Sequence, residues 1–272
     1  MTKKITFSFG KNWQRYLKEA YNEKNVQLAK DSIKNFLGVE NLNGKTFLDI
    51  GCGSGLFSLS AYQLGAKNVI SFDVDKYSVE CCEYLRDKVS KPENWQVYHG
   101  SILDDKFLAT IPNADIVYSW GVLHHTGNMW AAIANAAKKI KEGGYFYIAI
   151  YNKHLGLRGS KNQLKLKKLY NRCPFVLKKF LEYSLWSSYI TKNFLKFKNP
   201  FKIIKSRENT PHFRGMNFGI DIFDWLGGLP YEFATAQEVF EFCKNKLKLQ
   251  IVNMYIVDET NALGNNHFLF KK

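Results

Sequence analysis

The chain shows two alternating patterns of apolar and polar positions between residues 46 and 151. Short apolar runs, typical of buried strands, are separated by longer segments in which apolar residues recur every three or four positions, typical of helices. The predicted strands are Thr46–Ile50, Asn68–Asp73, Trp95–His99, Asp115–Ser119 and Tyr145–Tyr151. The predicted helices are Leu56–Leu64, Lys76–Val89 and Met129–Ile140, and Lys141-Glu142-Gly143-Gly144 stops the last of them. Strands that alternate with helices in this way predict a parallel sheet with helices on both faces.

The pattern changes at Lys153. From there to Arg214, Leu, Phe, Tyr and Trp recur at helical spacing among many lysines, which predicts two or three amphipathic helices that form a cap over the sheet. The elements expected outside this region are a helix at Val26–Leu37, a helix at Thr235–Lys246, and strands at Gln250–Ile256 and His267–Phe270. We expect the last two strands to close the sheet as an antiparallel pair.

Together these elements predict an α/β fold with a doubly wound, Rossmann-like, mostly parallel seven-stranded sheet and a helical cap insertion after the fifth strand. We divide the chain into an N-terminal helical arm (1–45), a ligand-binding core (46–152), a basic helical cap (153–214) and the end of the core (215–272), which supplies a rim loop, a helix and the last two strands.

Positive charge is concentrated in the cap. The net charge of the chain is +15, and residues 153–214 hold sixteen Lys and Arg against two acidic residues, so the remainder is close to neutral. Such asymmetry indicates an anionic partner, which is a phosphorylated metabolite, a nucleic acid or a membrane surface. A solvated helical face would have the same composition, and this alternative stays open. The oligomeric state is not encoded in any of these patterns.

Composition narrows the class of protein. A hydrophobic content of 46% with 23% charged residues is typical of a folded domain. No apolar run approaches the ~18 residues of a membrane-spanning helix, and the N-terminus leads into no signal-peptide core, so we expect a cytoplasmic protein. The five cysteines are odd in number and form no C-x-x-C pair, which favours neither a disulfide framework nor a metal site.

A glycine-rich turn follows the first predicted strand, in the sequence Asp49-Ile50-Gly51-Cys52-Gly53-Ser54-Gly55. Glycines between a strand and a helix allow a tight turn and the close approach of a ligand to backbone N–H groups. The dinucleotide fingerprint requires its third glycine one residue later, where this chain has Leu56. Asp49 would repel a pyrophosphate, and it suits a ligand with an ammonium group, such as the methionyl part of S-adenosylmethionine.

A second carboxylate, Asp73, ends the second predicted strand 22 residues after Gly51. This matches the offset of about 20 residues at which an acidic residue accepts hydrogen bonds from ribose hydroxyls. With the loop, both acids and the order of the strands, the chain resembles the class I S-adenosylmethionine-dependent methyltransferases. The resembling segments are Thr46–Leu59, Val69–Asp75, His99–Asp104, Ala114–Thr126 and Gly143–Tyr151.

The resemblance implies S-adenosylmethionine as cofactor, with S-adenosylhomocysteine as product, and a set of cofactor-binding residues. These are Asp49, Gly51, Cys52, Gly53 and Gly55 at the methionyl and ribose region, Asp73 at the ribose, Val74 on the adenine, Ser101 and Ile102 at the adenine edge, and Ser119 and Trp120 near the sulfonium. Ser101 departs from the family, because many members have Asp there. A hydroxyl also accepts a hydrogen bond from the adenine amino group, so this departure changes only the strength of that contact.

Chemistry is expected directly after the fourth strand, in Ser119-Trp120-Gly121-Val122-Leu123-His124-His125-Thr126. Base-directed amino methyltransferases have an Asp/Asn-Pro-Pro-aromatic motif here, which this chain lacks, whereas Leu-His-His resembles small-molecule O- and C-methyltransferases. Histidine, with a pKa near 6.5, suits a base that removes a hydroxyl proton. The hypothesis is that His125, or failing that His124, is this base. The alternative is that both only cap or pack the following helix.

Further residues are assigned to the substrate side and to the arm. Tyr151 and Asn152 end the fifth strand at the same rim, and Arg214, Asp221 and Asp224 lie in a glycine- and aromatic-rich segment that resembles the post-cap segment of a bacterial methyltransferase subgroup. We expect these five to face the substrate, with Arg214 as an anion clamp, unless the segment only orients the cap. In the arm, Phe9, Asn12 and Trp13 are expected to fold over the cofactor, with surface packing as the alternative.

Four functions are compatible with these features. The favoured one is methyl transfer to a small polar or anionic metabolite, with O-methylation of a sugar, nucleotide or phosphorylated intermediate foremost. The second is methylation of a lipid-like quinol by a protein bound to an anionic membrane through its cap. The third is RNA methylation, which no RNA-binding motif supports, and the fourth is a cofactor-binding protein without turnover.

Overall fold

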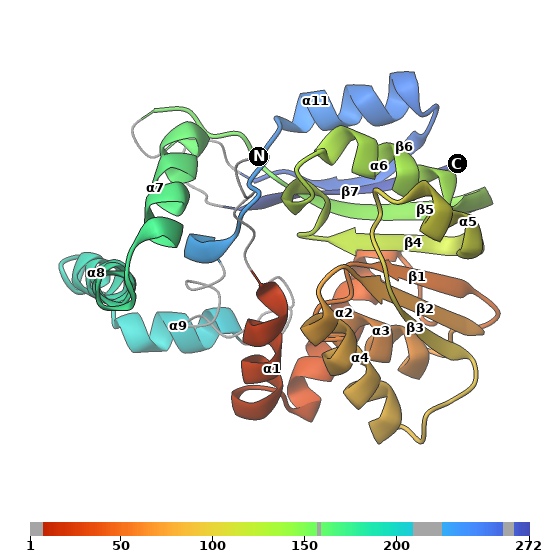
Figure 1. The fold of residues 1–272 in the computed structure, drawn as a ribbon, viewed down its shortest axis with the longest axis horizontal. Helices are drawn as coiled ribbons and strands as arrows, with labels where there is room; N and C mark the ends of the chain where they lie inside the picture. Colours follow the sequence, from red (N-terminus) through yellow and green to blue (C-terminus); the bar gives the residue numbers. More distant parts are fainter. Residues whose placement is uncertain (1–7, 157–158, 209–224, 258–263) are drawn as a thin grey trace.

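The computed structural model describes residues 8–156, 159–208, 225–257 and 264–272, without the side chains of 206–208. Its centre is a seven-stranded sheet in the order β3-β2-β1-β4-β5-β7-β6 (Figure 1). The strands are β1 Thr46–Ile50, β2 Asn68–Asp73, β3 Trp95–His99, β4 Ala114–Trp120, β5 Ile140–Tyr151, β6 Gln250–Tyr255 and β7 Asn265–Lys271. The first five are parallel, and β7 runs antiparallel to both β5 and β6. The predicted doubly wound sheet and its antiparallel closing pair are confirmed.

Helices surround this sheet. They are α1 Phe9–Glu19, α2 Glu23–Leu37, α3 Leu56–Gln63, α4 Lys76–Lys88, α5 Asp105–Thr110, α6 Met129–Lys138, α7 Ser160–Arg172, α8 Phe175–Phe194, α9 Pro200–Glu208 and α11 Ala236–Glu241. A 3-10 turn, η1, covers Leu123–His125, and a π-helical turn, η2, follows α11 over Phe242–Lys246. The short helix α5 has no predicted counterpart, because six residues are too few for a periodic pattern.

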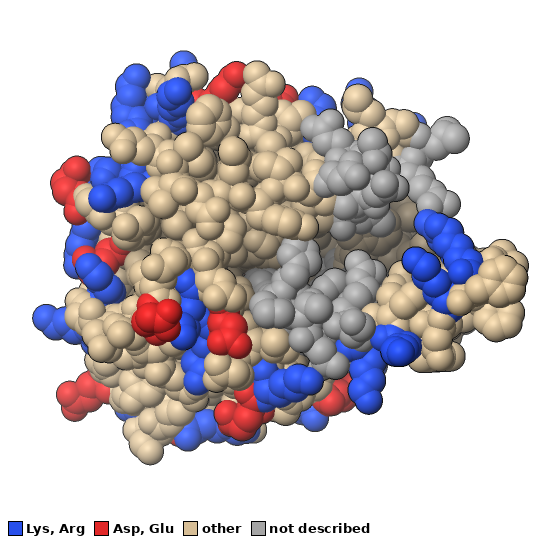
Figure 2. All heavy atoms as spheres, turned by 180° about the vertical axis from the view of Figure 1, so that it is seen from behind, with Lys and Arg blue, Asp and Glu red and all other residues tan. Residues whose placement is uncertain are grey.

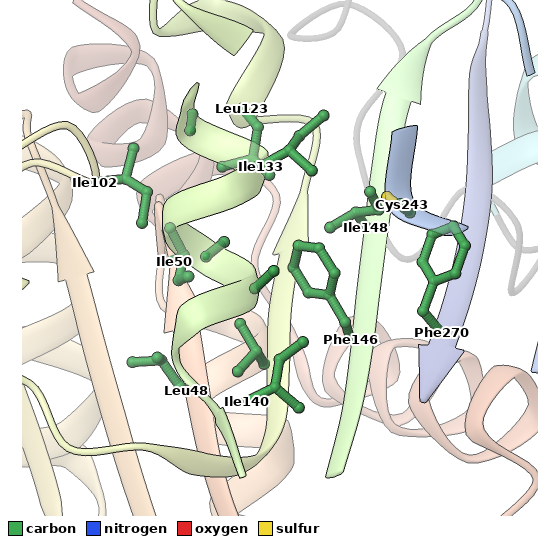
Figure 3. Packing of buried hydrophobic residues seen from close by; sticks show 14 of the residues in the cluster. Leu48, Ile50, Ile102, Leu123, Ile133, Ile140, Phe146, Ile148, Cys243 and Phe270 are labelled. Atoms are coloured by element: carbon green, nitrogen blue, oxygen red, sulfur yellow. The ribbon is translucent and has the colours of Figure 1, made fainter. Parts of the chain in front are cut away.

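Two apolar cores lie on opposite faces of the sheet. Successive strand residues point to alternate faces, and in β1 Leu48 and Ile50 belong to one core while Phe47 belongs to the other. Figure 3 shows the first core, in which strand residues such as Phe146 pack against Ile133 of α6. The second core contains residues from α1 to α4. All five residues of β1 are buried, as expected for the central strand of a two-sided sheet.

One predicted boundary is wrong. The glycine pair Gly143-Gly144 does not end a helix, because α6 already ends at Lys138 and β5 begins at Ile140. The pair lies within β5, beside a register shift against β4, and Gly143 has φ +72°. The Gly143 N–H donates to Lys272 O at 3.2 Å, and the Lys272 N–H donates to Gly144 O at 3.0 Å. The glycines therefore belong to an irregular part of β5 that pairs with Lys272. In the sequence alone, such a glycine pair looks the same as one that ends a helix.

The predicted cap consists of the three helices α7, α8 and α9. Figure 1 shows them on the side to which the arrowhead of β4 points, beyond the carboxyl ends of the parallel strands and not over a face of the sheet. The order of strands reverses between β1 and β4. Because ligands of doubly wound folds bind at the carboxyl ends where the order reverses, the cap faces the expected site.

Candidate active site

The glycine loop connects β1 to α3 with three residues in the left-handed region. Gly51, Gly53 and Gly55 have φ of +76°, +55° and +81°, which L side chains rarely adopt. Each also lies against a neighbour: a Cβ at Gly53 would be 2.9 Å from Nε1 of Trp13, and one at Gly55 would be 2.7 Å from Cα of Cys82. The loop therefore needs glycine for both its turn and its packing, and its backbone remains close to whatever binds beside it.

The two predicted carboxylates lie beside this loop. Asp49 is buried, and its Oδ2 accepts a hydrogen bond from Ser58 Oγ at 2.6 Å. Burial, with a smaller contribution from the nearby Asp73, raises the pKa of Asp49 to about 7. Asp73 accepts from the Gly53 N–H at 3.0 Å and from the Asp75 N–H at 2.9 Å, and burial raises its pKa to about 6.

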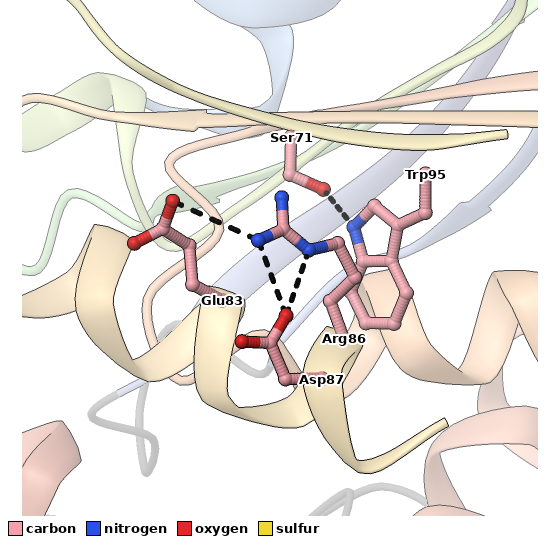
Figure 4. A network of polar contacts seen from close by, with 5 residues as sticks. All are labelled: Ser71, Glu83, Arg86, Asp87 and Trp95. Atoms are coloured by element: carbon pink, nitrogen blue, oxygen red, sulfur yellow. Dashed lines mark hydrogen bonds and ion pairs between the residues drawn. The ribbon is translucent and has the colours of Figure 1, made fainter. Parts of the chain in front are cut away.

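Buried polar contacts fix the orientation of Asp49. Trp95 Nε1 donates to Ser71 Oγ at 3.0 Å, as Figure 4 shows beside the separate ion-pair cluster on α4. Ser71 Oγ donates in turn to Ser58 Oγ at 2.8 Å, and Ser58 donates to the carboxylate. The chain of donors runs in one direction and ends on the acid. No ion pair joins Asp49 or Asp73 to Lys, Arg or His in the described parts of the chain, so the two desolvated acids suit a cationic, hydroxyl-bearing ligand.

The remaining predicted cofactor residues divide into exposed and buried side chains. Val74 has 69% of its surface exposed directly after Asp73, which leaves an apolar platform open to a ring. The side chains of Ile102 and Cys52 are buried in the two cores, so these positions can only offer their backbones to a ligand. Two effects raise the pKa of the Cys52 thiol well above its ordinary value: mainly a hydrogen bond with Cys82, and also burial. All five cysteines are free thiols.

Three further positions have intramolecular partners. Ser101 Oγ accepts a hydrogen bond from the Leu103 N–H at 3.2 Å. Ser119 is fully buried and donates to Ile50 O at 3.0 Å, which ties β4 to the end of β1. The Trp120 ring is perpendicular to that of His267 at a centroid distance of 5.3 Å. Of these contacts only that of Ser119 reaches the start of the glycine loop, and the roles of all three residues toward the cofactor stay predictions.

The arm packs against the glycine loop and the histidine turn. Trp13 contacts Gly53, and the ring of Phe9 lies 4.9 Å from that of His125. Asp75 holds the start of the arm, because its Oδ2 accepts from Ser8 Oγ at 2.8 Å and from the Gly10 N–H at 3.0 Å. Asn12 is buried. The arm thus joins the two parts of the expected site.

The two histidines lie in η1 and have different partners. His124 is fully buried, and its Nδ1 accepts from the Tyr151 N–H at 3.2 Å, so in the neutral ring Nε2 bears the hydrogen. Nε2 has no hydrogen-bond partner in the described parts of the chain. His125 donates from Nδ1 to Pro230 O at 2.5 Å, which leaves a lone pair on Nε2. Burial lowers the pKa of His125 to about 3 and that of His124 well below its ordinary value, so both rings are neutral at pH 7.

A buried lysine lies beside these histidines. Lys167 of α7 has no exposed surface, and its Nζ lies 4.7 Å, 4.8 Å and 6.0 Å from the ring centroids of Tyr231, Trp225 and Tyr151. It also donates to the backbone oxygen of Trp225. Cation–π contacts of this kind stabilise an ammonium group away from water. Its positive charge contributes to the low pKa of His124 and of His125.

The predicted substrate residues meet this cluster in part. The ring of Tyr151 is tilted against those of His124 and Tyr231, with centroid distances of 4.0 Å and 5.2 Å. The side-chain oxygen of Asn152 accepts from Asn266 Nδ2 at 3.0 Å, and its Nδ2 has no partner among the described residues. The remaining three predicted residues, Arg214, Asp221 and Asp224, lie outside the described residues.

Sequence reasoning missed Lys167, Tyr231, Glu232 and Asp75. Tyr231 donates to Gln163 of α7 at 2.8 Å, and the carboxylate of Glu232 accepts from the Met129 N–H at 3.1 Å, so the segment after the cap holds both α7 and the start of α6. Asp75 could have been found as an N-cap, since it precedes α4 and accepts from the Tyr77 N–H. For Lys167 no local signal exists among so many lysines.

Comparison with known proteins agrees with this geometry. The model of a methyltransferase domain family matches residues 21–189. The chain is 30% identical over 108 residues to a ubiquinone biosynthesis O-methyltransferase of Pelagibacter ubique, covering 40% of this chain and 42% of that protein. It is 33% identical over 105 residues to a ribosomal protein L11 methyltransferase of Helicobacter hepaticus, covering 34% and 32%. The chain thus spans less than half the length of these relatives.

Solved structures share the fold. Magnesium protoporphyrin IX methyltransferase from Synechocystis, solved with bound S-adenosylhomocysteine, superposes with a TM-score of 0.55 at 16% identity, over 96% of this chain and 93% of that one. A methyltransferase structure from Methanococcus maripaludis gives 0.54 at 15% identity over 100% and 96%. The family match covers more than half of the chain, and the resemblance drawn from the glycine loop is confirmed at this level. The chain belongs to the methyltransferase domain family.

Proposed function

We propose that this chain is an S-adenosylmethionine-dependent O-methyltransferase that acts on a small polar acceptor with a negatively charged group. The donor half of the proposal is carried by Asp49 and Asp73, two desolvated carboxylates on either side of the glycine loop. An ammonium group beside Asp49 would favour its ionised form. Each oxygen of Asp73 has a second lone pair beyond its backbone contact, which ribose hydroxyls can use.

The acceptor half is carried by His125. When bound, S-adenosylmethionine supplies an electrophilic methyl group on a sulfonium. The residues of the chain position the acceptor: a hydroxyl donates to Nε2 of His125, which aligns an oxygen lone pair for in-line attack. Nε2 would take the hydroxyl proton while the acceptor oxygen gains the methyl group that the sulfonium gives up, although burial makes the free ring a weak base. The bond from Nδ1 to Pro230 O stabilises the resulting imidazolium.

Lys167 and His124 support an acceptor with an anionic group. The ammonium of Lys167 lies among three aromatic rings beside the histidine turn. The orphan N–H of His124 is a buried donor, and an unpaired buried donor costs about 1–3 kcal/mol, so a ligand oxygen that accepts from it gains that energy. The basic cap adds long-range attraction of an anion.

A lipid-like quinol is the second candidate acceptor. The similarity to a ubiquinone biosynthesis enzyme and the exposed apolar residues of α8 favour it. In this case the quinol hydroxyl would take the place of the metabolite hydroxyl at His125, and the remaining steps would be the same.

The proposal is tested by labelled methyl transfer from S-adenosylmethionine into fractionated metabolites and lipids. His125→Asn retains a donor near Pro230 O but lacks the base, and we expect about 10²- to 10⁴-fold slower transfer with unchanged binding of S-adenosylhomocysteine. Thr126→Ala, in the same turn, is the control. Full activity of His125→Asn would refute the assigned base, and absence of any donor binding by the wild type would refute the function itself.

A further inference from the structure

Helix α8 has an apolar stripe that faces away from the rest of the protein. None of its twenty residues is buried. Val176, Phe180, Tyr183 and Phe194 are 79%, 64%, 69% and 73% exposed. At about 100° per residue these positions lie within one narrow sector of the helix. Soluble proteins rarely expose several large apolar side chains along one side of a helix without a partner.

The opposite side of α8 attaches it to α7. Glu182 accepts a hydrogen bond from Tyr170 Oη at 2.7 Å, and its other oxygen pairs with Lys179 at 2.7 Å. Lys178 lies over the Tyr170 ring at 5.5 Å from its centroid. Glu182 and Lys178, which contact Tyr170, lie more than a quarter turn away from the exposed stripe. They fix which face of α8 points outward.

Lysines lie near both ends of α8 and continue beyond it. Residues 175–205 contain seven lysines and one acid, Glu182, which is already paired. Lys192, Lys196, Lys198 and Lys202 form no ion pair with the described residues. Two large apolar residues lie among them, Phe197 and Phe201, with 101% and 64% exposure. In Figure 2 the region of α8 and α9 lies at the right edge, where blue basic side chains lie beside a tan, uncharged surface.

We infer that the α8–α9 surface docks this protein on an anionic lipid bilayer, with Val176, Phe180, Tyr183 and Phe194 in the boundary between headgroups and acyl chains. An interfacial helix needs an apolar face, basic residues nearby and a length that lies along the membrane. Helix α8 supplies the exposed apolar residues and the length, and the lysines at its end and on α9 supply the positive charge. Ser187, Ser188 and Thr191 line an open hollow together with Lys192 and Lys196, so hydroxyl and ammonium donors are available to lipid phosphates. No helix in the described parts of the chain is long and apolar enough to cross a bilayer.

Charge and composition favour a bilayer over two other occupants. A second copy of the chain would bring seven lysines against seven lysines, which opposes dimerisation through this face. A nucleic acid would attract the lysines but would leave the apolar stripe in water. An anionic bilayer takes up both, with a gain of about fivefold in affinity for each lysine near the surface.

Sedimentation of the full-length protein with vesicles tests the inference. We expect the protein to pellet with vesicles of equal phosphatidylcholine and phosphatidylglycerol, and to remain in solution with phosphatidylcholine alone. The triple substitution Lys192→Glu, Lys196→Glu and Lys198→Glu should weaken this binding by about a hundredfold or more. Its matched control carries the same charge change on other elements, at Lys106, Lys244 and Lys246, and should bind within about threefold of the wild type.

An apolar variant separates docking from mere attraction of charge. Phe180→Ser, Tyr183→Ser and Phe194→Ser together should reduce vesicle binding at least tenfold, because each removes apolar area that inserts. The control places Ser at Tyr84, Val252 and Met254, apolar residues on other elements that are 51%, 51% and 55% exposed.

Equal losses of vesicle binding in variant and control would overturn the inference. Failure of the wild-type protein to bind anionic vesicles, together with RNA binding or dimerisation through α8, would also overturn it. Binding of S-adenosylhomocysteine is measured in parallel, so failure of docking is distinguishable from failure of the proposed enzymatic function.

Discussion

Replacing Asp49 by Asn changes the charge at the centre of the donor site. The folded, ligand-free protein raises the pKa of this acid from 3.8 to about 7, chiefly by burial. Between these pH values the folded state binds the proton more tightly than the unfolded chain, so stability falls as pH rises through this window and the loss is complete near pH 7. With about 1.4 kcal/mol for each pKa step, the ionised carboxylate destabilises the fold by about 4 kcal/mol.

Asp49→Asn removes this pH dependence. Its new amide nitrogen lacks a placed acceptor, which costs about 1–3 kcal/mol at every pH. That cost cancels when two pH values are compared: between pH 5 and pH 8, the stability of the variant relative to wild type should increase by about 3 kcal/mol. Urea unfolding of the ligand-free proteins at both pH values measures this difference.

A control and a binding assay complete this test. Asp115→Asn removes a partly exposed carboxylate whose pKa is lowered overall, because its hydrogen bonds to Lys141 and Thr46 outweigh the effect of burial. The stability of this variant relative to the wild type should therefore stay constant above pH 5. Calorimetry at pH 8 should find that Asp49→Asn binds S-adenosylhomocysteine about ten- to a hundredfold more weakly, since an ammonium loses a charged partner. An equal advantage of Asp49→Asn at pH 5 and pH 8 would refute the reasoning.

Three other predictions concern the arm, the histidine turn and the buried lysine. Gly10→Ala would place a Cβ 2.5 Å from Asp75 Oδ1 and 2.6 Å from a backbone nitrogen of α4, so the clash should outweigh the gain in helix propensity of about 1 kcal/mol. Calorimetry should record weaker donor binding, and thermal unfolding a lower Tm. His125→Asn should make the stability of the protein less sensitive to acid. The pKa of His125 in the folded state, about 3, lies below the ordinary 6.5, so the wild-type free energy of unfolding falls as the pH drops below 6.5. The free energies of unfolding at pH 7 and pH 4.5 should therefore differ less in the variant than in the wild type. Lys167→Met keeps the apolar stem but removes the charge, and kcat/KM for an anionic acceptor should fall at least about tenfold while donor affinity stays constant; equal loss of both would contradict a role toward the acceptor.

Local patterns predicted the strands and the loop because those features depend on neighbouring residues. The alternation of apolar runs located β1 to β5, and glycine spacing with Asp49 and Asp73 identified the family. The Gly143-Gly144 pair was misread because a glycine at a strand irregularity and one at a helix end use the same positive φ. What distinguishes the two uses here is a hydrogen-bond partner far along the chain, Lys272, which the local sequence does not show.

The acceptor side depended on contacts that the sequence does not reveal. Lys167 stands beside Lys165 and Lys168 in an ordinary basic helix, yet it alone of the three is fully buried. Its burial results from Tyr231 and Trp225, more than fifty residues later. Periodicity marks which residues of a helix share a face, but the partner of that face is set by the tertiary fold. The cap was therefore predicted as helical and basic, but the burial of Lys167 was not predicted.

A crystal structure with S-adenosylhomocysteine tests the central claim most directly. We predict the ribose hydroxyls within hydrogen-bond distance of the Asp73 carboxylate, the amino group facing Asp49, and the sulfur directed toward Nε2 of His125. Binding at another place, or a sulfur that faces away from the histidine turn, would contradict the account.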